Sequence, residues 1–506
     1  MNRSGNLYSL IQKNAPEDVN TTLITTETGL SYSWSDMDHW SGGYAALLRE
    51  SGLAKGDRVA VQVEKSPQSL FLYLACLRSG LIYLPMNTAY HADEVAHLLG
   101  NAEPAAIVAD PGAEVLKGDP GVSRRWTLTS DGTGSFTEEA ASRLGGDFET
   151  VASEPGDTAA ILYTSGTTGK PKGAMLSHRN LAANGLALRD SWGFTSRDVL
   201  LHALPLFHAH GLFVACHTVL LAGARFLWMT QFDRDRVIAS LPRATVFMGV
   251  PTYYTRLLSA DALSASSCRT IRLFVSGSAP LLEETFTSFR NRTGQAILER
   301  YGMTETGMNT SNPYDGERRA GTVGLPLPGV SVRVVGEDGG TLSAGKVGML
   351  QVRGENVFGG YWRMPEKTAE DFTADHWFIT GDLAVIEDQG YIRLVGRARD
   401  LIITGGYNVY PKEVELVLDA IDGIAESAVI GVPHPDFGEA VVAVVQCPED
   451  RPPPEAGTLI AIARQKLANY KVPKQVVFVR QLPRNAMGKV QKMLLRQQIA
   501  DNLLGG

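Results

Sequence analysis

The chain has few cysteines and no pattern that would pair them. Cys76, Cys216, Cys268 and Cys447 are the only four in 506 residues, and no two form a Cys-x-x-Cys motif. Disulfide-stabilised secreted domains and zinc ribbons both need clustered cysteines, so neither class of protein is expected. Scattered cysteines are typical of a reducing compartment, and we expect a cytoplasmic protein.

Long apolar runs and an excess of basic charge are also missing. The most apolar long window, residues 212–229, contains His217 and Arg225 and falls short of the roughly 20 apolar residues of a membrane span. Lys13 and polar residues stand near the start, where a signal peptide has an unbroken apolar stretch. The net charge of −7 provides no broad basic surface for nucleic acid. We therefore expect neither a membrane nor a nucleic-acid partner.

Three common catalytic motifs are absent as well. Gly169-Lys170 is followed by Pro171 rather than Ser or Thr, and Thr164 stands where a Walker A loop has its first glycine. No Gly-x-Ser-x-Gly or His-Glu-x-x-His motif occurs. A P-loop kinase, an α/β serine hydrolase and a zinc protease are therefore not expected.

Short β-branched runs alternate with helical stretches before residue 321. These runs occupy residues 58–63, 105–109, 159–163, 244–250 and 271–275. Apolar strands that alternate with helices are typical of parallel sheets covered on both faces, in which ligands bind beyond the carboxyl ends of the strands. We predict an α/β fold with two parallel-type sheets.

The pattern changes twice after this region. Short strands and turns at about 321–396 predict a small β-barrel or meander. From residue 397 the chain is predicted to be α+β, with helices at 413–421 and 459–467 and strands at 427–432 and 440–446. We predict a large N-terminal domain, residues 1–396, and a smaller mobile C-terminal domain, residues 397–506.

Residues 163–173 form the densest local signal, Tyr-Thr-Ser-Gly-Thr-Thr-Gly-Lys-Pro-Lys-Gly. The glycines let the backbone turn sharply and bring its N–H groups close to an anion, while hydroxyl and lysine side chains add donors and charge. We interpret the run as a polyphosphate-binding loop. The residues assigned to it are Thr164, Ser165, Gly166, Thr167, Thr168, Gly169, Lys170 and Lys172.

This loop and five later motifs resemble, in order, those of the adenylate-forming enzymes, which include acyl-CoA synthetases, luciferases and nonribosomal-peptide adenylation domains. The five are Tyr301-Gly-Met-Thr-Glu305, Thr380-Gly-Asp382, Gly396-Arg397, Thr404-Gly-Gly-Tyr407 and Leu482-Pro-Arg-Asn-Ala-Met-Gly-Lys489. The resemblance implies that a carboxylate attacks the α-phosphate of ATP, giving an acyl-adenylate and pyrophosphate. Such a transfer depends on positioning and charge stabilisation.

The resemblance also implies roles for the nucleotide-binding residues. Glu305 would hold Mg²⁺, which prefers carboxylate and phosphate oxygens. Thr304 would contact the α-phosphate, and Asp382 and Arg397 would bind the ribose. Tyr301 and Gly302 belong to the same nucleotide-binding motif as Thr304 and Glu305.

The C-terminal matches imply the catalytic lysine, the hinge and the coenzyme A site. Lys489 would bridge the attacking carboxylate and the α-phosphate; Lys492 lies one turn later, but the Gly-Lys spacing favours Lys489. Arg399 matches the hinge about which the small domain would pivot after adenylation. The residues that would then admit the pantetheine arm of coenzyme A are Gly405, Gly406 and Tyr407.

An arginine after a predicted strand suggests which carboxylic acid is the substrate. Arg256 follows the strand end by one and a half helical turns, so its planar guanidinium could pair a second carboxylate, although an arginine on a helix surface is the alternative. Its surroundings, with residues 275–279 and 301–310, resemble malonyl-CoA synthetases. That resemblance implies that Arg256 and Ser278 contact malonate, while His208 and Met303 shape its pocket. His208 and His210 lack a third ligand nearby for zinc.

These observations predict an ATP-dependent acid–CoA ligase that acts on malonate or methylmalonate, with ATP and coenzyme A as co-substrates. Another short-chain or aromatic acid is the nearest alternative. The alternative outside the enzymes is a protein that binds a nucleotide without turnover. Lys489 and Glu305 argue against it, because the binding of AMP alone requires neither residue.

Overall fold

The described chain forms two compact units. The computed structural model describes residues 5–117, 121–164, 171–448, 451–485 and 488–504. Unit 1 comprises residues 1–320, 324–331 and 352–378, and unit 2 comprises residues 321–323, 332–351 and 379–506. Most of the region 321–396 therefore groups with the carboxyl-terminal part by contact, whereas the sequence places it in the N-terminal domain. The boundary at residue 397 stays a prediction.

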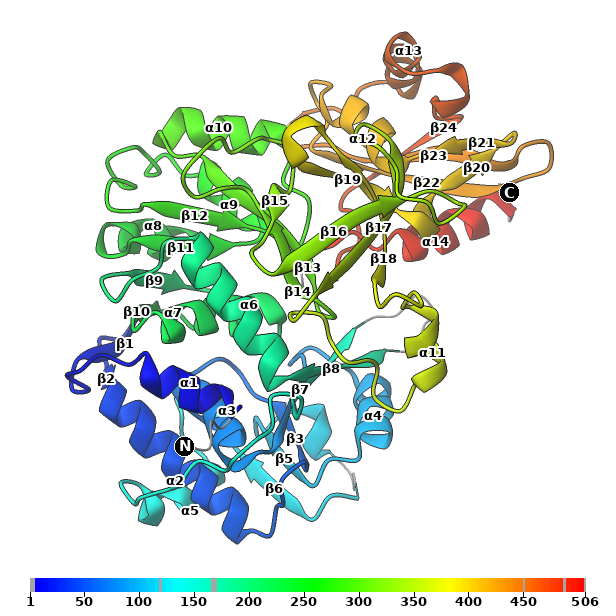
Figure 1. Cartoon of the computed structure of the whole chain (residues 1–506). Helices are drawn as coiled ribbons and strands as arrows, with labels where there is room; N and C mark the ends of the chain where they lie inside the picture. The colour runs from blue at the N-terminus through cyan, green and yellow to red at the C-terminus, as the bar shows by residue number, and fades with distance from the viewer. Residues whose placement is uncertain (1–4, 118–120, 165–170, 449–450, 486–487, 505–506) are drawn as a thin grey trace. The chain divides into compact units, whose positions relative to one another are not determined.

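Unit 1 is built on two sheets whose strands are mostly parallel. Their orders are β6-β5-β3-β4-β7-β8 and β15-β14-β13-β12-β11-β9-β10-β1-β2. Strands β1 and β2, blue in Figure 1, join the green sheet beside β10. The strands are β1 (Thr22–Thr26), β2 (Ser31–Ser33), β3 (Arg58–Gln62), β4 (Ile82–Pro85), β5 (Ala106–Ala109), β6 (Arg124–Thr127), β7 (Thr158–Thr164), β8 (Lys172–Ser177), β9 (Val199–His202), β10 (Arg225–Trp228), β11 (Val246–Gly249), β12 (Leu273–Ser276), β13 (Ile297–Met303), β14 (Gly307–Ser311) and β15 (Leu325–Pro326).

Helices connect and cover these strands. They are α1 (Leu7–Lys13), α2 (Trp34–Glu50), α3 (Pro67–Ser79), α4 (Ala92–Ala102), α5 (Ser135–Ala140), α6 (His178–Ser191), the π-helix η3 (His210–Cys216), α7 (His217–Leu221), α8 (Arg234–Ser240), α9 (Pro251–Leu258), α10 (Glu283–Thr293) and α11 (Pro365–Glu370). No helix in the described part of the chain is both long and apolar enough to cross a bilayer.

The predicted α/β class is confirmed. Each of the five predicted runs contains a strand, namely β3, β5, β7, β11 and β12. Strands β11 and β12 are buried along their whole length, because helices cover both faces of a parallel sheet and the strands must be apolar throughout.

The parallel order also brings the functional segments to one edge. Strands β9, β11, β12 and β13 are hydrogen-bonded neighbours running in the same direction. The loops that follow β9, β11 and β12 therefore leave the same edge of the sheet, where ligands bind in open α/β folds.

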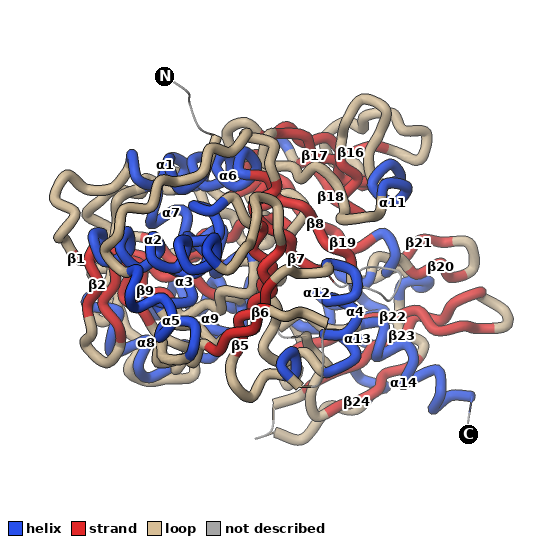
Figure 2. Tube along the Cα trace, turned by 90° about the horizontal axis from the view of Figure 1, so that it is seen from below, coloured by secondary structure: helices blue, strands red, loops and turns tan. Residues whose placement is uncertain are grey.

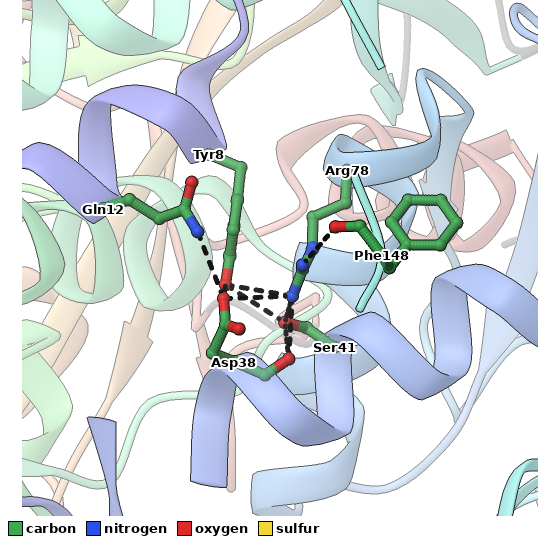
Figure 3. Close-up of polar contacts among 6 residues, drawn as sticks. All are labelled: Tyr8, Gln12, Asp38, Ser41, Arg78 and Phe148. Atoms are coloured by element: carbon green, nitrogen blue, oxygen red, sulfur yellow. Dashed lines mark hydrogen bonds and ion pairs between the residues drawn. The ribbon is translucent and has the colours of Figure 1, made fainter. Parts of the chain in front are cut away.

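A buried ion-pair network fixes the first helices of unit 1. Arg78 of α3 donates to the carboxylate of Asp38 (3.1 Å) and to the hydroxyl of Ser41 (3.0 Å), both on α2. The hydroxyl of Tyr8 on α1 donates to the same carboxylate at 2.6 Å, and Arg78 also donates to the carbonyl of Phe148 at 2.8 Å (Figure 3). The buried arginine is thus compensated, and we interpret this cluster as structural.

Unit 2 contains a meander sheet and an α+β sandwich. The meander has the order β16-β17-β18-β19, and the second sheet has the order β21-β20-β23-β22 with β24 beside β23. The elements are β16 (Val330–Val335), β17 (Val347–Gly354), β18 (Phe378–Ile386), β19 (Ile392–Arg397), β20 (Ile402–Thr404), β21 (Tyr407–Val409), α12 (Pro411–Asp419), β22 (Glu426–His434), β23 (Gly438–Gln446), α13 (Ala456–Lys466), β24 (Gln475–Val479) and α14 (Lys492–Leu504).

Alternating side chains of β22 and β23 divide the sandwich into two cores. Val429 and Val441 pack with residues of α12 and α13, whereas Ile430 and Val442 pack with residues of α14. Helices α12 and α14 accordingly lie on opposite sides of these strands (Figures 1 and 2). The period of two along a strand produces this arrangement.

Candidate functional site

The predicted phosphate loop connects two antiparallel strands. Thr164 at the end of β7 pairs with Lys172 at the start of β8. Ser165, Gly166, Thr167, Thr168, Gly169 and Lys170 lie outside the described residues. Lys172 is only 6% exposed, with its ammonium 3.8 Å from the carboxylate of Asp371 and 4.4 Å from the ring centroid of Tyr361. Burial lowers the pKa of Lys172.

Glu305 stands in the turn between β13 and β14 and is held by two hydroxyl donors. Tyr361 donates to its Oε1 at 3.2 Å and Thr164 donates to the same atom at 3.4 Å. The carboxylate is 6% exposed. Residues from β7, the β13–β14 turn and the segment before α11 therefore converge on one acid, as the motif predicts for a functional group.

A close backbone crossing shapes the rest of this motif. A Cβ atom on Gly302 would lie 2.1 Å from the carbonyl oxygen of Gly307, so only glycine fits there. Tyr301 is buried, while Met303 and Thr304 are partly exposed beside it. The structure thus brings Thr304 and Glu305 together in one tight turn.

The predicted acid pocket gathers residues from the loops after β9 and β12. Ser278 has a φ of +75°, a strained value for a non-glycine residue, and such strain is concentrated at functional sites. Its hydroxyl lies 3.2 Å from Nδ1 of His210. Burial, together with the nearby Arg300 charge, keeps the pKa of His210 well below its usual value, so the ring is neutral at physiological pH. His208 is partly exposed in the same loop.

Arg300 is a buried charged residue near these side chains that the sequence analysis did not single out. It is 3% exposed on β13, and its Nε and Nη2 have no hydrogen-bond partner among the described residues. Its guanidinium packs against Gly277, where an added Cβ would lie 2.5 Å from Cζ. Burial lowers the pKa of Arg300 to about 9, still charged at neutral pH. The available signal was a Glu-Arg pair inside an otherwise apolar strand.

A buried guanidinium without partners is energetically costly, because desolvation of an ion costs several kcal/mol. An anionic ligand removes that cost by supplying both charge and acceptors. Arg300 packs on Gly277, its charge acts on His210, and Ser278 lies within hydrogen-bond distance of that histidine, so these three side chains gather donors suited to a carboxylate.

Arg256 occupies a different environment. It lies on α9, as predicted, but its side chain is exposed to solvent. Tyr254 and Leu257 are the buried residues of this helix, and Tyr254 donates to the carbonyl of Val275 at 2.6 Å. A contact between Arg256 and the substrate stays a prediction.

In unit 2 the two predicted ribose residues meet across a strand pair. Asp382 on β18 is the cross-strand partner of Arg397 on β19, and Arg397 Nε lies 2.8 Å from Asp382 Oδ1. Thr380 supports both: its hydroxyl accepts from the Asp382 amide at 3.0 Å, and its carbonyl accepts from Arg397 at 3.1 Å. The acid is 6% exposed, and its contact with a ribose stays a prediction.

The predicted coenzyme A residues form a hairpin turn. Thr404 and Tyr407 are cross-strand partners, and Gly405 and Gly406 between them have φ values of +56° and +80°. A two-residue turn of this kind requires positive φ at both positions, which favours glycine. Tyr407 is 58% exposed and stacks on Tyr470 with the ring centroids 4.7 Å apart.

The predicted hinge residue and the predicted catalytic lysine are both exposed. Arg399 lies in the short helix Ala398–Asp400 after β19. Lys489 is exposed, and residues 486–487 of its motif lie outside the described residues. Lys492 is partly exposed, with its ammonium 2.6 Å from the buried carboxylate of Glu415. The catalytic role of Lys489 stays a prediction.

The metal prediction depends on Glu305 alone. Within the described ranges, no three His, Cys, Asp or Glu residues form a cluster that would hold a metal ion. Mg²⁺ that accompanies a nucleotide needs only one or two carboxylates, because phosphate oxygens and water complete its shell. Glu305, with its second oxygen Oε2 not engaged by Tyr361 or Thr164, fits such an ion.

Comparison with known families gives two matches along the chain. The family described as AMP-binding enzyme matches residues 11–362, and the AMP-binding enzyme C-terminal domain matches residues 413–489.

Individual relatives extend the likeness. The mitochondrial malonate–CoA ligase ACSF3 of Mus musculus is 42% identical over 67% of this chain and 64% of its own length. A feruloyl-CoA synthase of Amycolatopsis is 34% identical over 93% of this chain and 94% of its own length. The crystal structure of ATP-bound MatB from Rhodopseudomonas palustris is 49% identical, covers 99% of both chains and has a TM-score of 0.95.

Proposed function

The chain belongs to the family of AMP-binding enzymes, and from this premise we propose that it is an AMP-forming acid–CoA ligase for malonate, with methylmalonate as a second substrate. In the first step a carboxylate oxygen of malonate attacks the α-phosphorus of ATP, and pyrophosphate leaves. In the second step the thiol sulfur of coenzyme A attacks the acyl carbon, its proton passes to solvent, and AMP leaves. The products are malonyl-CoA, AMP and pyrophosphate.

The observation that carries this proposal is the buried guanidinium of Arg300 near Ser278 and His210, because its Nε and Nη2 have no hydrogen-bond partner among the described residues. A monocarboxylic acid presents only the carboxylate that reacts, so it would leave this cation unpaired. Malonate has a second carboxylate, which would accept from Nε and Nη2 in the bidentate geometry that arginine favours. Arg256, His208 and Met303 are proposed to border the same acid.

The adenylation step is proposed to use residues of both units. Glu305 would hold the Mg²⁺ that neutralises phosphate charge when bound, and Thr304 would donate to the α-phosphate. Asp382 and Arg397 would hold the ribose. Lys489 would place its ammonium between the attacking carboxylate and the α-phosphate, reducing their mutual repulsion.

The thioester step is proposed to follow a pivot of the C-terminal domain at Arg399. Lys489 would leave and the turn of Gly405 and Gly406 would approach, because two glycines leave room for a thin pantetheine arm. Tyr407 would line that arm. The cytoplasm is the proposed compartment, and the mitochondrion, which the name of the mouse ligase gives, is the alternative that cell fractionation decides.

A pyrophosphate-exchange panel tests the proposed acid. ATP–pyrophosphate exchange should be fastest with malonate, then methylmalonate, and slow with acetate, benzoate, ferulate and octanoate. Fastest exchange with a monocarboxylic acid would remove the dicarboxylate assignment. Ferulate belongs in the panel because a feruloyl-CoA synthase is among the relatives. Absence of exchange with every acid would favour a nucleotide-binding protein without turnover.

A further inference from the structure

The loop that carries Lys489 is closed by its own backbone. The amide of Asn485 donates to the carbonyl of Lys489 (2.9 Å), and the amide of Lys489 donates to Oδ1 of Asn485 (3.0 Å). The amide of Gly488 donates to the carbonyl of Asn485 at 2.9 Å, and Gly488 has a φ of +73°. These bonds tie Gly488 and Lys489 to Asn485, but they do not fix the direction of these three residues relative to the rest of unit 2.

Arg484 connects the near side of this loop to β22. Its Nη1 donates to the carbonyl of Gly488 at 2.6 Å, and its Nη2 pairs with the carboxylate of Glu426. One guanidinium thus contacts both the residue before Lys489 and a strand of the central sheet. Because the guanidinium is planar and rigid, it holds these two contacts in a fixed geometry.

Lys492 anchors the far side of the loop to α12. Its ammonium lies 2.6 Å from Oε1 of Glu415, a carboxylate only 6% exposed. The same carboxylate oxygen accepts from the amide of Val429 on β22 at 2.9 Å. Burial of this pair makes it stiff, because the lysine cannot leave without exposing an uncompensated buried charge.

We propose that Arg484 and Lys492 are positioning residues that aim Lys489. The two ion pairs stand on either side of an exposed lysine, one to β22 and one to α12, and together they set the direction of the loop. This inference rests on the proposed function, which assigns Lys489 to adenylation. Neither residue contacts a substrate in this account; both act through Lys489.

The two half-reactions separate positioning from a general structural role. We expect Arg484→Met to lower the maximal rate of ATP–pyrophosphate exchange about 10- to 100-fold, the scale associated with a small misplacement of a catalytic group. The KM for ATP and thioester formation from supplied malonyl-adenylate should stay within about threefold of wild type. Arg484→Lys should recover part of the loss. Arg451→Met, which removes an exposed ion pair with Asp422, is the matched control and should change neither step.

A double variant tests whether the effect passes through Lys489. In the Lys489→Ala background, Arg484→Met should produce no further loss of residual exchange, because a positioning residue has nothing left to position. Removing both charges with Glu415→Gln and Lys492→Met tests the second anchor without leaving a buried unpaired ion. Equal losses in both half-reactions, or full additivity with Lys489→Ala, would overturn the proposal.

Hydrogen exchange gives a readout that needs no substrate. The amides of Gly488 and Lys489 should lose protection in Arg484→Met and keep it in Arg451→Met. Unchanged protection together with unchanged exchange kinetics would also overturn the proposal. Because this measurement is independent of the acid, a failure of the malonate assignment would leave it intact and the two failures would be distinguishable.

Discussion

At the scale of single residues, buried charge distinguishes the two candidate arginines. Arg300 is 3% exposed and has unpaired donors, whereas Arg256 is exposed on α9. Burial removes the hydration of Arg300, so an anionic ligand would stabilise its charge. Arg256 is exposed and keeps its hydration. The recognition of a second carboxylate should therefore depend more on Arg300.

Replacing Arg300 should change activity and stability in opposite directions. Arg300→Met should lower kcat/KM for malonate, because a buried ion pair with the ligand is lost. The decrease should correspond to a loss of about 2–5 kcal/mol of transition-state stabilisation. The ligand-free protein should melt at the same or a higher temperature, because an unpaired buried charge has been removed. Exchange kinetics and thermal melts measure the two effects. Arg256→Ala is the matched variant and should show the smaller loss.

An ion pair with malonate would be contradicted if Arg300→Met lost stability and used malonate normally. That result would make the arginine a structural residue and return the question of acid recognition to Arg256.

Replacing Lys489 should divide the reaction into its two steps. Lys489→Ala should reduce adenylation, measured as malonate-dependent pyrophosphate exchange, to a small residual rate, because no cation would then join the carboxylate and the α-phosphate. Thioester formation from supplied malonyl-adenylate should largely survive, because Lys489 would have left the site by then. Equal loss of both steps would count against a pivoting C-terminal domain.

At the scale of elements, the loop after β12 depends on a glycine, which has no side chain. Gly277 lets the guanidinium of Arg300 pack directly on the backbone, and the next residue, Ser278, takes the strained φ that turns its hydroxyl toward His210. The loop thus forms the pocket by close approach, which a Cβ atom would prevent.

Gly277→Ala should therefore impair the pocket more than the fold. The new Cβ would lie 2.5 Å from Cζ of Arg300, so the arginine must move. We expect a destabilisation of about 1–3 kcal/mol, the usual cost of overpacking, and a loss of malonate use larger than the loss of ATP binding. Gly100→Ala on α4, where an added Cβ meets nothing within 4 Å, is the control and should stabilise the protein slightly. Normal malonate kinetics in Gly277→Ala would refute the close-approach account.

At the scale of the whole molecule, four buried histidines of unit 1 and the buried Asp419 of unit 2 respond to acid in opposite ways. Burial lowers the pKa of His178 to about 4 and of His217 to about 3, and holds those of His202 and His210 well below their usual value. All four belong to unit 1. In unit 2, burial raises the pKa of Asp419 to about 6.

Unit 1 should lose stability as the pH falls below about 6.5, where unfolded histidines take up protons that the folded ones refuse. Each buried histidine should cost about 1.4 kcal/mol per pH unit until its folded pKa is reached. Asp419 acts in the opposite sense, because its raised pKa adds stability to unit 2 as the pH falls from 6 toward 3.8. Calorimetry between pH 7 and about 5 should show the transition of unit 1 moving down more than that of unit 2. Asp419→Asn should remove the gain in unit 2, and a pH-independent unit 1 would contradict the neutral-histidine account.

The class of fold, the family and the type of reaction could all be predicted from the amino-acid sequence, whereas the roles of single site residues stay predictions. Continuous apolar strands between helices specify a parallel sheet because both faces must be buried, and the ordered motifs specify adenylate formation because glycine, lysine and acid must stand at fixed spacings. Residues that are neighbours in the chain, such as Gly405 and Gly406, can be expected from the sequence to lie together. The same holds for residues that face each other across a hairpin, such as Asp382 and Arg397.

Packing between distant segments, in contrast, settles which charges are buried. The sequence analysis singled out Arg256, which follows a predicted strand and matches the malonyl-CoA synthetase pattern, and gave no reason to choose Arg300. Burial is a property of packing among β12, β13 and η3, which are far apart in the chain, and no local pattern encodes it. The same reason separates exposed Lys489 from Lys492, whose partner Glu415 lies more than 70 residues earlier.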